Sequence, residues 1–524
     1  MNYAIRKSFC RRAALSAVLI AAAGYTAAYA TDLPLTAPPP PSINWQPCPD
    51  SPFANRDCAT LTVPLDYANL AAGTIDLPVA RARATGSKVG TLVYNPGGPG
   101  FGASDTIGYD NLDQSFTPLL QSRFDIVTFD PRGAAQGIRC MGFGLQEHYW
   151  ETNLIPRTST ELNDRVALEQ NVNQGCLTNN DPLARHIDSA STVRDLEQFR
   201  RAMGLTQFNY MGRSYGTFLG YRYAKLYPGR LRAMVLDAAI DRSVPDRQSF
   251  TENAAVSDTM WQKYKEWCKV ASNPCKMRGR DIDAVFNQTL AQARVNPLPA
   301  PRAPFTQRPV NDWILAFIAQ AFAQPGDITF NSVDQLVYES SLGDASVARY
   351  FYDFATGAVE PNGNYRQDGQ ANRAITCVDT RWSQTLRTAA DLQQLLQQTK
   401  AAAPRFGESS VGQGATNCIG YPVDAIEPTP LSVQLTGVPP FVVIGATLDA
   451  STPYAWSTRI ASQIQGSRFI KRIGYGHVSY DKSRCVQQKV DNYLISLTLP
   501  ANGSTCQTDP DLYPPQDLLL PPLP

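Results

Sequence analysis

The sequence predicts an α/β fold in which a mostly parallel central sheet, flanked by helices, is interrupted by a large helical insertion. Short apolar strand-like runs alternate with helical stretches through the first half of the chain, and this alternation is typical of a parallel sheet. Strand-like runs then return near the C-terminus, at residues 440–445 and 469–473. We therefore expect one core, built from residues 31–239 and 436–524, with a helical lid at residues 240–435.

The elements of the first half can be placed in order. Gly90–Asn95 and Phe124–Asp130 are apolar runs that end in turn-forming residues, which is the pattern of buried strands. Ser191–Met203 is expected to be a helix with Thr192 as its candidate cap, because apolar residues recur there at helical spacing. The elements expected next are a strand from Phe208, a helix that ends at Pro228-Gly229, and a strand at Ala233–Leu236.

The proposed lid differs from the core in composition. It is rich in Gln and Ala, carries many aromatic residues, and is broken at residues 297–304 and 363–369. Its patterns are longer than those of the core and helical in period. One core with a large insertion therefore explains the chain better than two independent domains.

Composition and charge limit the classes of partner. Of the 524 residues, 43% are hydrophobic and 18% are charged, as expected for a globular protein with a large core. The formal net charge is +1, and basic residues form no run beyond the extreme N-terminus. The sequence therefore argues against nucleic acid or an anionic membrane as the main partner.

The first thirty residues have the pattern of a cleaved signal peptide. Basic residues precede the apolar run Ala13–Ala23, and Ala28-Tyr29-Ala30 is a small-x-small cleavage site. A membrane anchor is the alternative, but the apolar run is too short to span a bilayer comfortably. Arg11-Arg12 could belong to a twin-arginine signal, although an ordinary secretory route fits its context better. We therefore predict a secreted or periplasmic protein with residues 1–30 removed and no stable membrane anchor.

The cysteines support an oxidising compartment. Ten remain once the leader is removed, and an even number in an exported chain indicates disulfides. Zinc is the rival interpretation, but the chain has no C-x-x-C motif and only three histidines. Spacing alone does not fix the connectivity; pairing of sequence neighbours would give Cys48–Cys58, Cys140–Cys176, Cys268–Cys275, Cys377–Cys418 and Cys485–Cys506.

The run Gly212-Arg213-Ser214-Tyr215-Gly216 is a G-x-S-x-G motif between an apolar strand and a helix. This motif forms a sharp turn that holds a nucleophilic serine at its tip, and the small residues on either side keep the crowded turn free of clashes. The positive end of the following helix points at whatever the serine attacks. Ser214 is therefore the candidate nucleophile.

A serine nucleophile needs a base, and the base needs an orienting carboxylate. His477 lies in a glycine-rich loop after the last predicted strand, whereas His148 and His186 lack such a setting. Asp449 follows the strand at residues 440–445, and Asp237 at the end of an earlier strand is its rival. The order Ser214, Asp449, His477 is the one expected of a serine hydrolase with this type of turn.

The oxyanion hole requires two backbone N–H groups. Tyr215 supplies one, and the loop Asn95–Gly100 is the candidate source of the other because its backbone can approach the substrate closely. Gly97 is the preferred donor and Gly98 is the second choice. The chain contains no phosphate-binding or dinucleotide-binding motif, so we expect no cofactor and no metal.

These motifs together resemble the exported tripeptidyl-aminopeptidase-like enzymes, which are related to proline iminopeptidases within the α/β-hydrolase superfamily. The resemblance spans most of the mature chain. It rests on Cys58–Tyr67, Asn95–Gly100, Phe129–Gly133, Ser214–Thr217, Ala374–Asp379, Gly474–Tyr480 and the segment from Cys485 to Cys506. Two departures affect the expected substrate preference: Arg213 stands where a small residue is usual, and Ala134–Gly137 replaces a G-x-S continuation.

The resemblance implies an α/β-hydrolase fold and a serine aminopeptidase whose helical lid recognises the free N-terminus of a short peptide. Such an enzyme needs an acid to bind the substrate ammonium group. Glu339 and Asp379 are the leading candidates in the lid, with Asp344 and Asp353 as further choices. An esterase or lactonase with the same triad is the alternative, and a non-catalytic binding protein is disfavoured because every catalytic role is filled.

Overall fold

The structure is a computed structural model that describes residues 42–326, 329–358, 369–425 and 429–514. The predicted signal peptide, residues 1–30, lies outside the described residues, as does most of the predicted break at residues 363–369.

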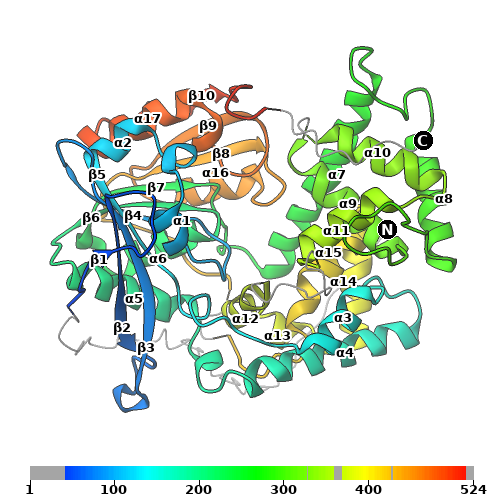
Figure 1. Cartoon of the computed structure of the whole chain (residues 1–524), viewed down its shortest axis with the longest axis horizontal. Coiled ribbons are helices and arrows are strands. Elements are labelled where there is room, and N and C mark those ends of the chain that lie inside the picture. The colour runs from blue at the N-terminus through cyan, green and yellow to red at the C-terminus, as the bar shows by residue number, and fades with distance from the viewer. Residues whose placement is uncertain (1–41, 327–328, 359–368, 426–428, 515–524) are drawn as a thin grey trace, which may run out of the picture. The chain divides into compact units, whose positions relative to one another are not determined.

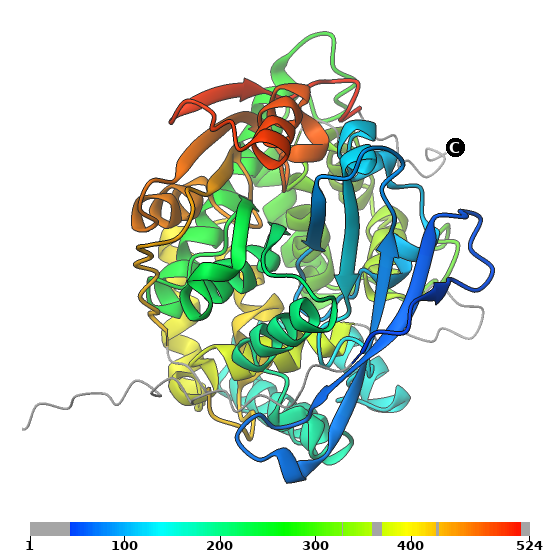
Figure 2. The same cartoon turned by 90° about the vertical axis from the view of Figure 1, so that its left-hand side faces the viewer.

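The core is a ten-stranded sheet with the strand order β1-β2-β3-β5-β4-β6-β7-β8-β9-β10. The β2–β3 ribbon lies toward one edge of the sheet, and β10 forms the other edge (Figure 2). The strands are β1 (Gln46–Pro47), β2 (Arg56–Pro64), β3 (Thr74–Ala82), β4 (Gly90–Asn95), β5 (Phe124–Phe129), β6 (Phe208–Arg213), β7 (Leu231–Asp237), β8 (Val442–Leu448), β9 (Arg468–Tyr475) and β10 (Ser504–Gln507).

Neighbouring strands from β5 to β10 are parallel, whereas β1, β2 and β3 pair antiparallel with their neighbours. Side chains alternate between the two faces of the sheet: Leu92 and Tyr94 pack in one hydrophobic cluster and Val93 in the other. The predicted α/β class with a mostly parallel sheet is confirmed. The antiparallel strands and β10 were not predicted.

Helices of the core cover both faces of this sheet (Figure 1). The helix predicted at Ser191–Met203 begins two residues earlier. Its N-cap is Asp188, whose side chain accepts the amide of Ser191, so the assignment of Thr192 as the cap was wrong. The core helices are α1 (Ser104–Tyr109), α2 (Pro118–Arg123), α5 (Ser189–Ala202), α6 (Tyr215–Leu226), α16 (Tyr454–Gln463) and α17 (Arg484–Ser496).

The insertion after β7 is helical and separates β7 from β8 (Figure 1). Two earlier helices, α3 (Phe143–Glu151) and α4 (Ser159–Thr178), are bonded to it: Arg157 just before α4 pairs with Glu408 at 2.8 Å. The insertion contains α7 (Asp246–Lys269), α8 (Ile282–Val295), α9 (Asp312–Ala323), α10 (Phe330–Ser341), α11 (Ser346–Thr356), α12 (Gly369–Asp379), α13 (Trp382–Thr385), α14 (Ala389–Ala402), α15 (Gly407–Gln413) and the 3-10 turn η6 (Ala415–Cys418).

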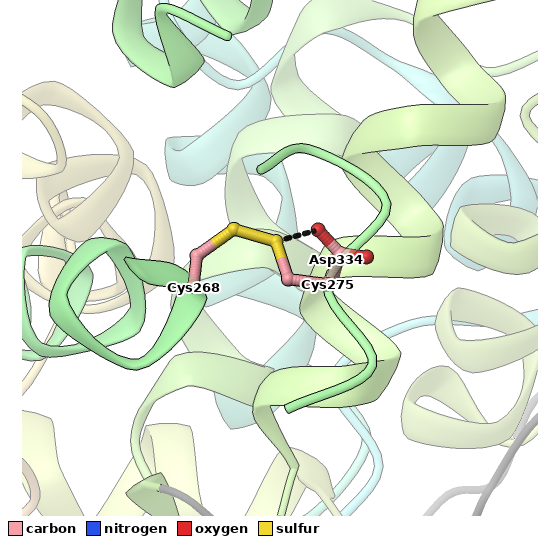
Figure 3. A group of neighbouring side chains, drawn as sticks. All are labelled: Cys268, Cys275 and Asp334. Carbon is pink, nitrogen blue, oxygen red and sulfur yellow. Dashed lines mark hydrogen bonds between the residues drawn. A yellow bond between two sulfur atoms is a disulfide. The ribbon is translucent and has the colours of Figure 1, made fainter. Parts of the chain in front are cut away.

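All ten described cysteines form the five disulfides that neighbour pairing gives. One of them, Cys268–Cys275, lies beside Asp334, whose carboxylate is 3.0 Å from the sulfur of Cys275 (Figure 3). The two sulfur atoms are bonded to each other, and Asp334 accepts the amide of Lys276 at 2.6 Å. This group therefore anchors a loop of the insertion to α10.

None of the helices in the described ranges combines the length and the apolar character needed to cross a bilayer. The five disulfides are consistent with an exported protein.

Candidate active site

The candidate catalytic residues follow the carboxyl ends of neighbouring strands. Ser214 follows β6, Asp449 follows β8 and His477 follows β9, while the loop at residues 96–100 follows β4. These strands are adjacent in the sheet, apart from β7 between β6 and β8. Because the strands are parallel, residues from distant parts of the sequence are delivered to one edge of the sheet, where such folds bind ligands.

Ser214 occupies the strained turn that the motif predicts. Its backbone has φ 53° and ψ −125°, a left-handed region that residues with a side chain rarely adopt. Glycine is required on both sides, since a Cβ at Gly212 would lie 2.4 Å from the carbonyl of Gly216. A Cβ at Gly216 would lie 2.6 Å from the carbonyl of Asn95. The amide of Ser214 donates to the carbonyl of Asp237 at 3.0 Å, which ties the turn to β7.

His477 and Asp449 form a close pair. The ring nitrogen Nδ1 of His477 lies 2.8 Å from Oδ2 and 3.1 Å from Oδ1 of Asp449. The other contacts of this carboxylate come from its own turn, where the amides of Ser451 and Thr452 and the hydroxyl of Thr452 all donate at 2.9 Å. Asp449 is therefore fixed before it orients the imidazole. The role of Thr452 was not predicted, although its position three residues after the aspartate is typical of such turns.

The pair shifts the pKa values of both groups. Burial favours the neutral imidazole, but the charge and hydrogen bond of Asp449 and the charge of Asp237 together outweigh it and raise the pKa of His477 above its usual range. Burial also opposes ionisation of Asp449, yet His477 and the turn hydrogen bonds hold the pKa of that carboxyl below its usual range. Asp449 is therefore ionised at neutral pH, and His477 stays protonated to a higher pH than a free histidine.

We expect the rate of hydrolysis to rise with pH through the raised pKa of His477. Only the neutral imidazole can take a proton from Ser214, so the midpoint of kcat/KM against pH should lie above the ordinary histidine value of about 6.5. The stability that the charged pair contributes is fully present below the unfolded pKa and is lost as pH rises through the folded pKa. A pH profile with its acid limb below 6 would contradict this electrostatic account.

Asp237, the rival acid, has a different role in the structure. Its Oδ2 accepts the amides of Ser479 at 2.9 Å and Tyr480 at 2.8 Å. These two residues continue the loop that carries His477. Asp237 thus holds the loop from beneath, and the hydrogen bond to the imidazole belongs to Asp449.

Ser214 itself is half-buried, and its hydroxyl makes no hydrogen bond with any of the described residues. The serine and the histidine are therefore brought to the same edge of the sheet but are not joined in this structure. Catalytic hydrogen bonds are commonly long in enzymes without substrate and tighten when the substrate binds.

The loop after β4 lies directly against the nucleophile. A Cβ at Gly97 would be 2.8 Å from the Cβ of Ser214, so glycine is needed for this close approach. The amide of Gly97, however, donates to the side chain of Asn95 at 3.0 Å. The next amide, that of Gly98, has no acceptor among the described residues. The geometry therefore favours Gly98 over Gly97 as the loop donor, which reverses the order expected from the sequence.

Tyr215 provides the other expected N–H group as the first residue of α6, where the amide has no acceptor within the helix. Its phenol reaches the insertion and donates to Oδ2 of Asp379 at 2.6 Å. The side chain of Tyr215 is buried, so this bond fixes the residue that follows the nucleophile.

Arg472 on β9 clamps the histidine loop and was not predicted. It is fully buried, and its Nη2 donates to the carbonyls of Gly476 at 2.7 Å and Val478 at 3.0 Å. These carbonyls belong to the residues on either side of His477. Its Nη1 donates to the hydroxyl of Thr508 at 2.6 Å, which connects the loop to the segment after β10. An arginine within a strand gives no sequence signal for such a role.

We expect Arg472→Met to lower kcat by about 10- to 100-fold, because the loop that carries His477 would lose two of the contacts that hold it in place. Arg468→Met is the matched control, since Arg468 lies on the same strand and bonds only to carbonyls before it. Both variants should be checked for thermal unfolding. Equal losses of activity in the two variants would contradict the positioning role.

Arg213 packs beneath the nucleophile turn and does not line the pocket. Its guanidinium lies over the rings of Tyr94 at 5.4 Å and Tyr480 at 5.7 Å, and it donates to the carbonyl of Ser115 at 2.9 Å. The side chain is buried. Arg213, which stands where a small residue is usual, therefore joins the nucleophile turn to the core and, through Tyr480, to the loop after His477.

The candidate acids of the lid are already bound to other groups. Glu339 is fully buried on α10, where it pairs with Arg302 and lies 3.7 Å from Lys276. Asp379 is buried on α12, and besides Tyr215 it accepts the amide of Ser189 at 2.9 Å. Asp344 and Asp353 likewise pair with Arg302 and Arg349. All four carboxylates are therefore already paired with other groups, and we assign none of them as the receptor for a substrate amine.

Two hollows adjoin the site. A cavity of about 270 Å³ is lined by His477 together with Gln324 and Pro325 of the insertion, so the insertion reaches the candidate catalytic histidine. A groove of about 680 Å³ begins at Gly100 and runs along Gln136 and Gly137. The second departure from the family pattern, Ala134–Gly137, therefore forms part of a groove next to the oxyanion loop.

Two family models match separate parts of the chain. The family model described as alpha/beta hydrolase fold matches residues 90–277, and the model described as TAP-like protein matches residues 403–506. Residues 278–402, between the two matches, all belong to the helical insertion.

Alignments with several named relatives cover most of the chain. The chain is 27% identical to the serine protease Hip1 of Mycobacterium tuberculosis over 88% of its own length and 91% of that protein. It is 28% identical to a tripeptidyl aminopeptidase of Streptomyces lividans, with 88% and 86% covered. It is equally 28% identical to carboxylesterase B of Mycobacterium tuberculosis, with 89% and 90% covered. The chain is therefore similar to the TAP-like α/β hydrolases over most of its length.

Proposed function

We propose that this protein is an exported aminopeptidase that releases short peptides or single residues from the N-terminus of its substrates. The observation that carries the chemistry is the bond between His477 and Asp449, set at the same sheet edge as the strained Ser214. The relatives named as a tripeptidyl aminopeptidase and a serine protease support a peptide substrate. The leader pattern of residues 1–30 and the five disulfides support a secreted or periplasmic location.

In the proposed mechanism, His477 takes the proton of Ser214 as the serine oxygen attacks the substrate carbonyl. The amides of Gly98 and Tyr215 hold the oxyanion that forms. Asp449 keeps the proton on Nδ1 of the imidazole and stabilises its charged form. His477 then protonates the leaving amine, and a water molecule, activated by the same histidine, hydrolyses the acyl-enzyme.

An esterase is the second candidate, and the relative named carboxylesterase B favours it. Ester and amide hydrolysis use the same catalytic groups, so the triad does not separate them. The difference lies in the leaving group and in how the insertion receives the acyl part of the substrate.

A substrate panel tests the proposal. Tripeptidyl and aminoacyl anilides with free N-termini would be compared with N-acetylated versions and with simple alkyl esters, and Ser214→Ala would serve as the blank. We expect cleavage of the free peptidyl anilides and at least a tenfold loss of kcat/KM on acetylation, since one lost charged contact costs about that much. Turnover of esters alone, or indifference to acetylation, would overturn the aminopeptidase assignment in favour of the esterase.

A further inference from the structure

A second cavity lies inside the helical region, apart from the cavity at His477. Its volume is about 160 Å³, and its walls come from α3, α9, α12 and residues 412–417. Tyr149 and Trp150 of α3 and Trp313 and Phe317 of α9 form its aromatic part. At roughly 30 Å³ for each water molecule, it is large enough for a small organic group.

Two hydrogen-bond donors at this cavity have no acceptor among the residues that the structure describes. The indole nitrogens of Trp150 and Trp313 are both buried, and neither finds a hydrogen-bond partner in the described part of the chain. Trp313 is only 1% exposed, and its ring stacks on Phe317. Buried donors are almost always satisfied in folded proteins, so an unsatisfied pair at one cavity indicates a missing acceptor.

The charges beside the cavity are also unbalanced. Arg165 and Arg373 both pair with Glu169, and all three residues are at least nine-tenths buried. Two arginines against one glutamate leave a net charge of +1 within this cluster. Two nitrogens of Arg165, Nε and Nη1, are buried and lack partners among the described residues.

This charge lies against the cavity wall. The guanidinium carbons of Arg165 and Arg373 are 5.1 Å and 4.9 Å from the centre of the Tyr149 ring. Arg373 itself lines the cavity, as does Asn417, whose side chain accepts from Arg373 at 3.2 Å. A buried charge without a counterion is costly, and an anion in the cavity would remove that cost.

We propose that this cavity binds a small carboxylate group. A carboxylate supplies the acceptors that both indoles lack and the negative charge that the cluster lacks. Water alone would satisfy the indoles but would leave the charge uncompensated, and a neutral amide has the same shortcoming. The volume suits the side-chain carboxylate of Asp or Glu, or a free acid of the size of propionate.

The cavity is connected to the catalytic site through α12. Gln370 and Arg373 of this helix line the cavity, while the side chain of Asn372 donates to the carbonyl of Pro99 at 2.9 Å. Pro99 belongs to the loop that approaches Ser214. The carboxylate can therefore come from an acidic residue of the substrate, an option that rests on the proposed function, or from a free small acid.

Binding is tested first on the full-length mature Ser214→Ala protein, so that no turnover is needed. Propionate is titrated against propionamide and propylammonium, with calorimetry and the indole ¹⁵N–¹H resonances as readouts. We expect saturable binding of propionate alone, with shifts at Trp150 and Trp313. The double variant Trp150→Phe/Trp313→Phe keeps an aromatic ring at both positions but removes both N–H donors, and it should weaken binding at least tenfold.

Trp456→Phe is the matched control, because its indole already donates to Glu252 at 2.8 Å and it does not line the cavity. It should bind propionate as the parent protein does. Absence of saturable binding, equal binding of propionamide, or unchanged binding in the double variant would each overturn the proposal.

The source of the carboxylate is tested on the active enzyme with peptidyl anilides that differ only in Glu or Gln. If the substrate supplies it, the double variant loses at least tenfold in kcat/KM for the Glu peptides alone, and propionate competes with them. If a free acid supplies it, propionate binds without competing. Failure of all peptide hydrolysis would refute the proposed function but would leave the binding result intact.

Discussion

Ser214→Ala is expected to reduce hydrolysis by about five to six orders of magnitude, the largest effect of any single substitution in this chain. The variant removes the attacking oxygen but retains the Cβ, so the turn with its positive φ is preserved. The residual rate would come from the oxyanion donors and from substrate binding. The measurement is kcat/KM on the best anilide of the panel, together with labelling by a fluorophosphonate probe.

The control for this variant is Ser383→Ala, which removes a buried hydroxyl in the insertion that has no hydrogen-bond partner among the described residues. It should keep activity within a few-fold of the parent and should still be labelled. Ser214→Ala should fold normally and should not be labelled. Labelling at another serine, or activity that survives in Ser214→Ala, would show that the nucleophile lies elsewhere.

Asp449→Asn is expected to lower kcat by about 10⁴-fold with little change of structure. The asparagine oxygen can take the place of Oδ1, which accepts the amides of Ser451 and Thr452. Its NH₂ group would then face Nδ1 of His477 and donate to it. The imidazole proton would be forced onto the other nitrogen, which could no longer accept the proton of Ser214.

The variant Asp237→Asn tests which of the two acids, Asp449 or Asp237, orients His477, a choice that the sequence left open. Only Oδ2 of Asp237 has partners among the described residues, namely the amides of Ser479 and Tyr480, and an amide oxygen can accept both. We expect a loss of kcat below tenfold for Asp237→Asn. A loss as large as that of Asp449→Asn would assign the orienting role to Asp237. The two variants should be compared at the pH of maximal activity, since removal of either charge lowers the pKa of His477.

Much of the core could be predicted because its signals are local. The strand Gly90–Asn95 was predicted to the residue, since its apolar run is bounded by glycine on one side and a Pro-Gly cluster on the other. The antiparallel strands β2 and β3 were missed. They lie near the sheet edge and mix buried with exposed residues, so they show neither a clean alternation nor a continuous apolar run.

The candidate site likewise contains residues that could be predicted from the sequence and residues that could not. Ser214, Asp449 and His477 could be selected because each follows a strand, and parallel strands bring such positions to one edge. Arg472 could not be selected, because its function depends on carbonyls that only the folded loop presents. The choice of Gly98 over Gly97 likewise depends on a side chain, that of Asn95, which accepts the amide of Gly97 and whose orientation no motif encodes.

The serine-hydrolase chemistry could be predicted from the sequence, because a nucleophile turn, a glycine-rich loop and the order of three residues can all be recognised along the chain. Only the tertiary structure shows which charged side chains are already paired with another group. Glu339 and Asp379 looked equally available in the sequence, yet one pairs with Arg302 and the other binds Tyr215. Charged groups pair whatever their separation in the sequence, so only the fold shows which carboxylates are already paired and that two nitrogens of the buried Arg165 have no partner among the described residues.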